Sequence, residues 1–236
     1  MNDLKKETKR IQSNKIFINY DESFAEPFFL YPRTINNLDS EIIKNVEKNL
    51  SLTFTKEKEI PSEGEVCFMN SPEVRPEFRL SFSTIDVIDY VYAILYSSSY
   101  REKYTRKDFP EVPCPTDSTA FWKLVALGNE LRQIHLLECS LVEKFITTYP
   151  VGGNNLINQI QYRENKVFIN EMQYFENVPR ISWELYIGNY QPAQKWLTDK
   201  KEKELSLKEI LLYQKIIVAL KETDRMTKEI DKIVTE

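Results

Sequence analysis

The chain has 236 residues, of which 42% are hydrophobic, 12% are aromatic and 29% are charged. This composition excludes a disordered or collagen-like chain and allows either one large domain or two small ones. The formal charge of −4 is nearly balanced, so any polyanion must bind at a local patch and not through the overall field. With only 5 glycines, most glycine-rich phosphate loops are excluded as well.

Neither a membrane span nor a secretory leader is visible in the sequence. No apolar run reaches the roughly 18 residues of a transmembrane helix, and the first fifteen residues lack the apolar stretch of a signal peptide. Cys67, Cys114 and Cys139 are far apart and show no spacing typical of zinc or redox sites. We therefore expect a cytoplasmic protein without a membrane partner, with reduced and mostly buried thiols.

The first 82 residues form a β-rich N-terminal segment in this interpretation. KIFINY (residues 15–20) and PFFLYP (residues 27–32) have short apolar runs next to Asn and Pro, which is typical of strands and loops. Residues 39–50 place apolar side chains at helical spacing. SLTFT (residues 51–55) then indicates another strand.

Residues 83–236 form a helical and β domain, with a further boundary near residue 150. Ser83 and Asp86 resemble a capping box, and the spacing that follows predicts a helix over 83–96. The three prolines of DFPEVPCP (residues 108–115) predict an extended segment.

A second long helix is predicted from Ser118, as its N-cap, to about Thr147. Gly128 inside it indicates a close approach of another helix or backbone segment. The predicted inward-facing residues are Phe121, Leu124, Leu127, Leu131, Ile134, Leu141 and Phe145.

YPVGGNN (residues 149–155) is a clear break, after which IQYR and KVFIN around Glu164 and Asn165 predict a hairpin. Ser206 and Glu209 form a capping box for a third long helix to about Ile233. The expected fold class is therefore α+β, with mixed β-rich segments packed with three long amphipathic helices.

No catalytic or metal-binding motif is recognisable. The single histidine, His135, lies within a predicted helix, and we interpret it as packed and hydrogen-bonded, not catalytic. No Walker, GxGxxG, GxSxG or HExxH pattern occurs. A stand-alone hydrolase or nuclease is therefore the least favoured function, and we assign neither catalytic nor metal-binding residues.

YREKYTRK (residues 100–107) is one candidate nucleic-acid segment. It interleaves tyrosines with cations, a composition suited to phosphate contacts and aromatic stacking. The alternative is a solvated helix end whose cations lie favourably near the C-terminal dipole. The candidate phosphate-binding residues are Arg101, Lys103, Arg106 and Lys107.

YIGNYQPAQKWLTDKK (residues 186–201) is the second candidate segment. Its lysines Lys195, Lys200 and Lys201 are candidate phosphate contacts, because lysine binds phosphate as a point charge. Gln191 and Gln194 are candidate base contacts, because glutamine pairs with the adenine edge. The alternative is a strand or turn with a buried Trp196 and Leu197 and lysines at its rim.

Several segments in order carry a family resemblance. They are DYVYAILYSSSYREKY (residues 89–104), DFPEVPCP (108–115), LVALGNELRQIHLLE (124–138), YIGNYQPAQKWLTDKK (186–201) and LSLKEILLYQKIIVALKET (205–223). With these segments the chain resembles the C-terminal specificity region of Type ISP and related single-chain restriction–modification enzymes. In that family an adenine-specific DNA methyltransferase lies upstream of this region.

The resemblance implies a target-recognition domain that binds duplex DNA sequence-specifically and does no chemistry itself. The chain lacks the FxGxG-like loop and the NPPY motif with which such methyltransferases bind S-adenosylmethionine and adenine. No cofactor is therefore expected here; S-adenosylmethionine belongs to the parent enzyme, whose methyltransferase and restriction portion is the expected partner. Relatives must read different sequences, so YREKY and QPAQKWL are expected to be scaffold or backbone contacts. Base readers are expected in residues 63–79 and 154–166, including Asn154, Asn155 and Gln159.

A second hypothesis comes from a different class. The three long amphipathic helices suit a protein-interaction module that docks on a methyltransferase or translocase partner, with the DNA held mainly by that partner. An exposed apolar patch favours docking, whereas a concave basic strip favours DNA.

Overall fold

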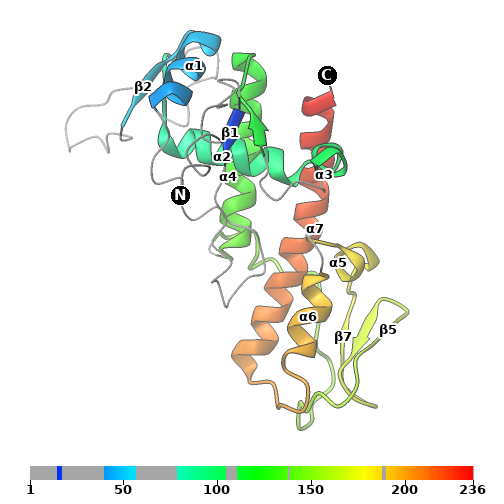
Figure 1. Cartoon of the computed structure of the whole chain (residues 1–236). Helices are drawn as coiled ribbons and strands as arrows, with labels where there is room; N and C mark the ends of the chain where they lie inside the picture. Colours follow the sequence, from blue (N-terminus) through cyan, green and yellow to red (C-terminus); the bar gives the residue numbers. More distant parts are fainter. Residues whose placement is uncertain are drawn as a thin grey trace, which may run out of the picture. The chain divides into compact units, whose positions relative to one another are not determined.

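The computed structural model describes residues 15–17, 40–56, 79–104, 111–137, 139–187 and 190–235. The described residues contain seven helices and small sheets, which confirms the predicted α+β class (Figure 1). They divide into two compact units. Unit 1 holds the described residues up to Asn129 together with those from Ile230 onward, and unit 2 runs from Glu130 to Glu229.

Unit 1 contains two small strand pairs. Strand β1 (Lys15–Phe17) pairs antiparallel with β4 (Glu111–Pro113), and β2 (Thr53–Thr55) pairs parallel with β3 (Ser81–Ser83). The strands predicted at residues 15–20 and 51–55 are confirmed for these described parts, and the extended segment predicted at residues 108–115 contains β4. Residues 27–32 lie outside the described ranges. Strand β3 crosses the predicted domain boundary at residue 82, with unit 1 on both sides.

The helices of unit 1 begin with α1 (Ser40–Leu50), which confirms the helical spacing of residues 39–50 and buries Ile42, Val46 and Leu50. Helix α2 (Thr84–Tyr96) begins where Asp86 Oδ2 accepts hydrogen bonds from the Ser83 backbone N–H at 2.8 Å and from Ser83 Oγ at 2.7 Å. The helix predicted over residues 83–96 is confirmed, and it is buried on more than one side. Every residue from Asp89 to Ser97 is buried, because this helix runs through the core of the unit and is apolar nearly all round.

Helix α3 (Ser98–Tyr104) follows directly, and α4 (Ser118–His135) comes after β4. The predicted cap of α4 was displaced by one residue. Asp117 Oδ1, not the Ser118 side chain, accepts a hydrogen bond from the Ala120 N–H at 2.6 Å, since an Asp at the N-cap position satisfies a free helix donor.

The predicted end of α4 near Thr147 is wrong. The helix ends at His135, and Leu137 then adopts the left-handed conformation with φ of 57°, which an α-helix cannot propagate through. Residues after it form turns, so Leu141 is only half-buried and Phe145 is 37% exposed. The apolar spacing in this stretch therefore does not correspond to a continuing helix.

The predicted close approach at Gly128 is confirmed. A Cβ atom at this position would lie 1.8 Å from the backbone carbonyl oxygen of Asp89 on α2. The neighbouring Asn129 Nδ2 donates to Asp89 Oδ2 at 3.1 Å. Helices α2 and α4 can therefore cross this closely only because the residue at position 128 is a glycine, which has no side chain.

Unit 2 begins with the residues that close α4 and then forms a three-stranded antiparallel sheet in the order β5 (Gln161–Arg163), β6 (Lys166–Phe168), β7 (Tyr174–Glu176). The predicted hairpin is confirmed: Glu164 and Asn165 form the turn with φ of 50° and 58°. Two positive φ values in a two-residue loop suit the right-handed twist of the flanking strands.

Short helices α5 (Arg180–Glu184) and α6 (Pro192–Thr198) precede the long α7 (Leu207–Thr235). Figure 1 shows α6 beside the first half of α7, and Tyr213 of α7 donates from its hydroxyl to the Ala193 carbonyl at 3.3 Å. The third long helix predicted after Ser206 is confirmed as α7, and its Ile210, Tyr213, Ile217, Leu220 and Ile230 are all buried. None of the helices in the described ranges is both long enough and apolar enough to cross a membrane.

The glutamate of the α7 capping box also forms an ion pair with a lysine. Glu209 Oε2 accepts hydrogen bonds from the Ser206 N–H at 2.9 Å and from Ser206 Oγ at 2.7 Å, and Lys200 Nζ donates to Glu209 Oε1 at 2.8 Å. The hydrogen bond from Lys200, followed by those from Ser206, lowers the pKa of Glu209 from 4.5 to about 2.

The lowered pKa predicts that the ionised Glu209 carboxylate stabilises the folded protein and that acid removes this contribution. The folded state favours the ionised carboxylate, so its contribution is complete above pH 4.5 and is lost as the pH falls toward about 2. We expect the unfolding free energy of the wild type to fall more steeply across this window than that of Glu209→Gln. Denaturant titrations at a series of pH values measure it, with Glu204→Gln, an exposed glutamate, as the control. Parallel curves for wild type and Glu209→Gln would contradict the assignment.

Candidate nucleic-acid interface

The sheet of unit 2 separates a core face from an outer face. Tyr162, Val167 and Phe175 are opposite one another across the three strands and face the core, where Val167 and Phe175 are fully buried. The Tyr162 ring stacks on Trp183 of α5 with centroids 5.6 Å apart. Since strand side chains alternate between faces, the residues on either side of these three lie on the outer face.

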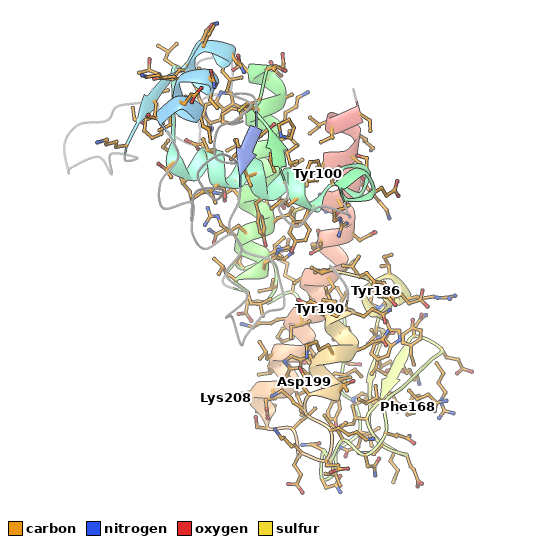
Figure 2. The ribbon with its side chains drawn as sticks, in the orientation of Figure 1. Tyr100, Phe168, Tyr186, Tyr190, Asp199 and Lys208 are labelled. Atoms are coloured by element: carbon orange, nitrogen blue, oxygen red, sulfur yellow. The ribbon has the colours of Figure 1, made fainter. Side chains whose placement is uncertain are left out.

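The outer face carries a cluster of cations and aromatic rings. The Arg163 guanidinium lies 4.1 Å from the centre of the Phe168 ring, and Phe168 contacts Tyr174 with ring centroids 5.0 Å apart. Lys166 Nζ lies 4.5 Å from the Tyr174 ring centre and pairs with Glu176 at 3.0 Å. Figure 2 labels Phe168 on this sheet. We call these residues, with Gln161, the outer-face cluster.

A buried amide network holds the loop before the sheet. Gln173 Oε1 accepts hydrogen bonds from the Asn155 N–H at 2.8 Å and from Asn170 Nδ2 at 3.0 Å. Gln173 Nε2 donates to Asn155 Oδ1 at 2.7 Å. Gln173 is 2% exposed and Asn170 is 8% exposed, so the network is shielded from water and fixes the loop rigidly against the turn after β6.

The three predicted base readers of this loop differ in how free their side chains are. Asn155 uses both ends of its amide internally, since Oδ1 accepts from Gln173 and Nδ2 donates to the Leu205 carbonyl at 3.2 Å. Asn154 is exposed, and among the described residues its Oδ1 accepts a hydrogen bond from the Leu156 N–H alone, at 3.1 Å. The half-buried Gln159 has no side-chain hydrogen bond with a described residue. Asn154 and Gln159 thus keep donors and acceptors available, while Asn155 supports the loop.

The segment of residues 186–201 contains helix α6, whereas the alternative interpretation placed Trp196 and Leu197 in a strand or turn. Pro192 occupies the first helical position of α6, where its fixed φ and missing N–H are tolerated, and Trp196 and Leu197 are buried on this helix. Gln191 Nε2 donates to the Glu184 carbonyl at 3.2 Å, and Gln194 Nε2 donates to the Trp183 carbonyl at 3.1 Å. Both predicted amides therefore bond to the end of α5.

The three lysines of this segment differ in whether a carboxylate pairs with them. Lys195 Nζ pairs with Asp199 at 2.8 Å, and Lys200 Nζ pairs with Glu209 at 2.8 Å while lying 4.8 Å from the Trp196 ring centre. Lys201 is exposed and has no ion pair with any described residue. Among the three, Lys201 keeps its full charge available for a phosphate.

The remaining predicted phosphate contacts belong to unit 1. Arg101 is half-buried on α3. Lys103 lies on the same helix, whereas Arg106 and Lys107 fall outside the described residues, as does most of the predicted base-reading stretch at 63–79. The lysines and glutamines of 186–201 and the loop with Asn154 all belong to unit 2.

Two outer-face residues were missed as individual site residues. Gln161 and Arg163 are exposed on the outer face of β5. The sequence does contain a signal, since NQIQYR alternates polar and apolar residues directly before the hairpin turn. Alternation of this kind places the glutamine and the arginine on one face of a strand.

Among the residues that the structure describes, there is no group of three or more potential metal ligands. His135 is buried, its Nε2 lies 2.7 Å from Thr223 Oγ1, and burial lowers the pKa of His135 well below its ordinary value. The prediction of a packed, hydrogen-bonded histidine is confirmed. Cys114 is a buried free thiol, and burial raises its pKa to about 11.

Comparison with solved structures shows where related folds occur. A nuclease-deletion mutant of the Type ISP restriction–modification enzyme LlaGI, in complex with a DNA substrate mimic, matches with a TM-score of 0.50 and 17% identity over 62% of this chain and 14% of that chain. The DrdV–DNA complex matches with a TM-score of 0.48 and 20% identity over 61% of this chain and 18% of that chain.

The ATP-dependent Type ISP restriction–modification enzyme LlaBIII bound to DNA matches with a TM-score of 0.49 and 16% identity over 67% of this chain and 11% of that chain. This chain thus spans less than a fifth of the length of each of these proteins. No curated protein matches the chain.

The family assignment comes from the sequence as a whole. Residues 7–229 match the profile of the Type ISP C-terminal specificity domain, so the match includes both units and the outer-face cluster. This confirms the resemblance inferred from the segments between residues 89 and 223. The chain belongs to the Type ISP C-terminal specificity domain family.

Proposed function

We propose that this chain recognises a specific sequence in duplex DNA, as the target-recognition part of a restriction–modification enzyme with adenine-specific methyltransferase activity. The observation that carries the proposal is the match of residues 7–229 to a specificity-domain family. The fold similarity to LlaGI, whose structure contains a DNA substrate mimic, supports it. The methyltransferase and restriction functions belong to a separate portion of the parent enzyme.

The chemistry of the described residues agrees with a binding role. The single histidine is buried and hydrogen-bonded, and the described residues hold no cluster of metal ligands. S-adenosylmethionine belongs to the methyltransferase portion in this proposal, because the chain has no FxGxG-like loop and no NPPY motif. The chain's own contribution is the placement of amides and cations against DNA.

Binding and selection experiments with the 236-residue chain test the proposal. Fluorescence anisotropy with labelled duplexes is expected to show an affinity that falls steeply as salt rises, because bound lysines and arginines release counterions from the phosphates. Selection from a random-sequence duplex pool is expected to enrich one consensus. Absent binding, salt-independent binding or a pool that stays random would each overturn the proposal.

Lysine and amide substitutions should separate phosphate contacts from base contacts. Lys201→Ala is expected to weaken binding to all sequences equally and to reduce the logarithmic salt slope by about 1, because one fewer counterion is released. Asn154→Ala and Gln159→Ala are expected to cost about 1–3 kcal/mol on the selected site alone, with an unchanged salt slope. Anisotropy titrations on selected and scrambled duplexes measure both effects.

Lys228→Ala is the matched control, because Lys228 already pairs with Asp224 at 2.7 Å on α7. Lys228→Ala should leave the affinity for DNA and the logarithmic salt slope unchanged. If the lysine change alters sequence preference and the amide changes do not, the two roles are reversed, and the segment of residues 186–201 reads the bases.

A further inference from the structure

The edge strand of the unit 2 sheet presents two polar side chains on the same surface. Strand β5 pairs only with β6 in this sheet, so its other edge is not occupied by a strand of the described chain. Gln161 and Arg163 lie on the outer face, opposite Phe168 and Lys166 of β6 respectively. Both are exposed, and neither amide nor guanidinium has a hydrogen bond to a described residue.

Arg163 differs from other arginines of unit 2. Arg180 pairs with Glu184 at 2.8 Å, and Arg225 pairs with three glutamates. Arg163 has no carboxylate partner among the described residues, and its guanidinium is instead 4.1 Å from the centre of the Phe168 ring. Stacking restricts the plane of a guanidinium while leaving its N–H groups free to bind an acceptor pair.

Lys166, which also lies on the outer face, is not available in the same way to bind an acceptor. Lys166, directly opposite Arg163, is paired with Glu176 at 3.0 Å. The hydrogen bond to Glu176 raises the pKa of Lys166, and this ion pair balances the charge of Lys166 within the cluster. Arg163 is therefore the uncompensated cation of the outer-face cluster within the described part of the chain.

The spacing of the two side chains matches the spacing of base pairs. Alternate residues of a strand are about 6.8 Å apart, and B-DNA rises about 3.4 Å per base pair, so residues i and i+2 address positions about two base pairs apart. The major groove presents a guanine edge that accepts a bidentate arginine and an adenine edge that accepts a bidentate glutamine. The β5–β6 hairpin lies at the edge of the three-stranded sheet that no other described strand occupies, so it can present both side chains to the groove.

We infer that the β5 edge of this sheet enters the major groove, with Arg163 reading a guanine and Gln161 reading an adenine about two base pairs away. The inference rests on the proposed function and adds to it the element that enters the groove and two specificity-determining residues. Phe168 lies against the Arg163 guanidinium and orients it, and Glu164 and Asn165 form the tight turn that joins β5 to β6.

Selection from a random duplex pool with the wild-type chain and with Arg163→Ala tests the inference. The wild type is expected to enrich a consensus containing a guanine that Arg163→Ala no longer selects, with an affinity for the wild-type consensus about 10- to 100-fold lower. Gln161→Ala is expected to lose an adenine at a second position. Arg180→Ala, which removes another exposed arginine of the same unit, should leave the consensus and affinity unchanged.

A charge-conserving variant guards against a folding defect. If Arg163→Ala lowers the melting temperature, Arg163→Lys keeps a cation but not the bidentate fork, and it should retain affinity for scrambled DNA while losing the guanine. Suppose that the wild type selects a consensus that Arg163→Ala, Arg163→Lys and Gln161→Ala all select as well, with wild-type affinity. That result would overturn the inference while the proposed function stands. If the wild type enriches no sequence, the proposed function fails, and the inference fails with it.

Discussion

Gly128→Ala is expected to destabilise the protein by about 3 kcal/mol or more, because the new methyl group would overpack the crossing of α2 and α4. The added Cβ would lie 1.8 Å from the Asp89 carbonyl oxygen and 2.6 Å from its carbonyl carbon. These are backbone atoms, so no side-chain rotation relieves the clash, and the two helices must move apart.

The sign of the stability change in Gly128→Ala shows whether the backbone clash or the helix propensity of alanine is the larger effect. Helix propensity alone favours alanine over glycine by about 1 kcal/mol in a helix interior, so a crossing without a clash would give a more stable variant. Denaturant unfolding measures the change. Gly152→Ala is the matched control, because a Cβ there meets no atom within 4 Å. Equal stability of the two variants would show that α2 and α4 do not approach closely at residue 128.

Trp196→Ala is expected to cost about 3–5 kcal/mol of folding free energy, the range for truncating a large buried aromatic side chain. Trp196 is 4% exposed on α6, and its ring lies 5.2 Å from that of Tyr213 on α7. Tyr213 in turn contacts Phe175 of the sheet with centroids 4.5 Å apart. The substitution therefore opens a cavity where α6, α7 and the sheet of unit 2 meet.

Thermal and denaturant unfolding check this expectation. Tyr186→Ala, at a tyrosine that is 58% exposed and labelled in Figure 2, is the control and should change stability by no more than about 0.5 kcal/mol. An unchanged melting temperature for Trp196→Ala would contradict the buried position, and would make stacking on nucleic acid or on a partner the better role for this tryptophan.

Local signals allowed several elements to be predicted from a few neighbouring residues. Ser206 with Glu209 and Ser83 with Asp86 mark helix starts, because each carboxylate lies within reach of the backbone N–H three residues earlier. Glu164 and Asn165 predict the hairpin for the same reason, since a two-residue turn restricts its own backbone. The interaction that determines each feature lies inside the segment that shows it.

Predictions that depended on the surroundings of a segment were less successful. The apolar spacing after His135 resembles a continuing helix, yet the left-handed backbone at Leu137 ends it. The segment with Trp196 has the aromatic content of a strand, but it forms a helix whose ring packs on Tyr213. Periodicity reports which side chains prefer burial, and it does not report which distant residue buries them.

The sequence by itself determined the family, the α+β class, the capping boxes and the hairpin, because these depend on segment order or on contacts only a few residues apart. It also identified Gly128 as a point of close approach, though not Asp89 as the neighbour. Only the tertiary structure decided that Asn155 is used internally and that Arg163 lies on Phe168 with no carboxylate partner among the described residues. Those outcomes depend on sheet register and on residues up to fifty positions apart, and a linear pattern does not contain such distances.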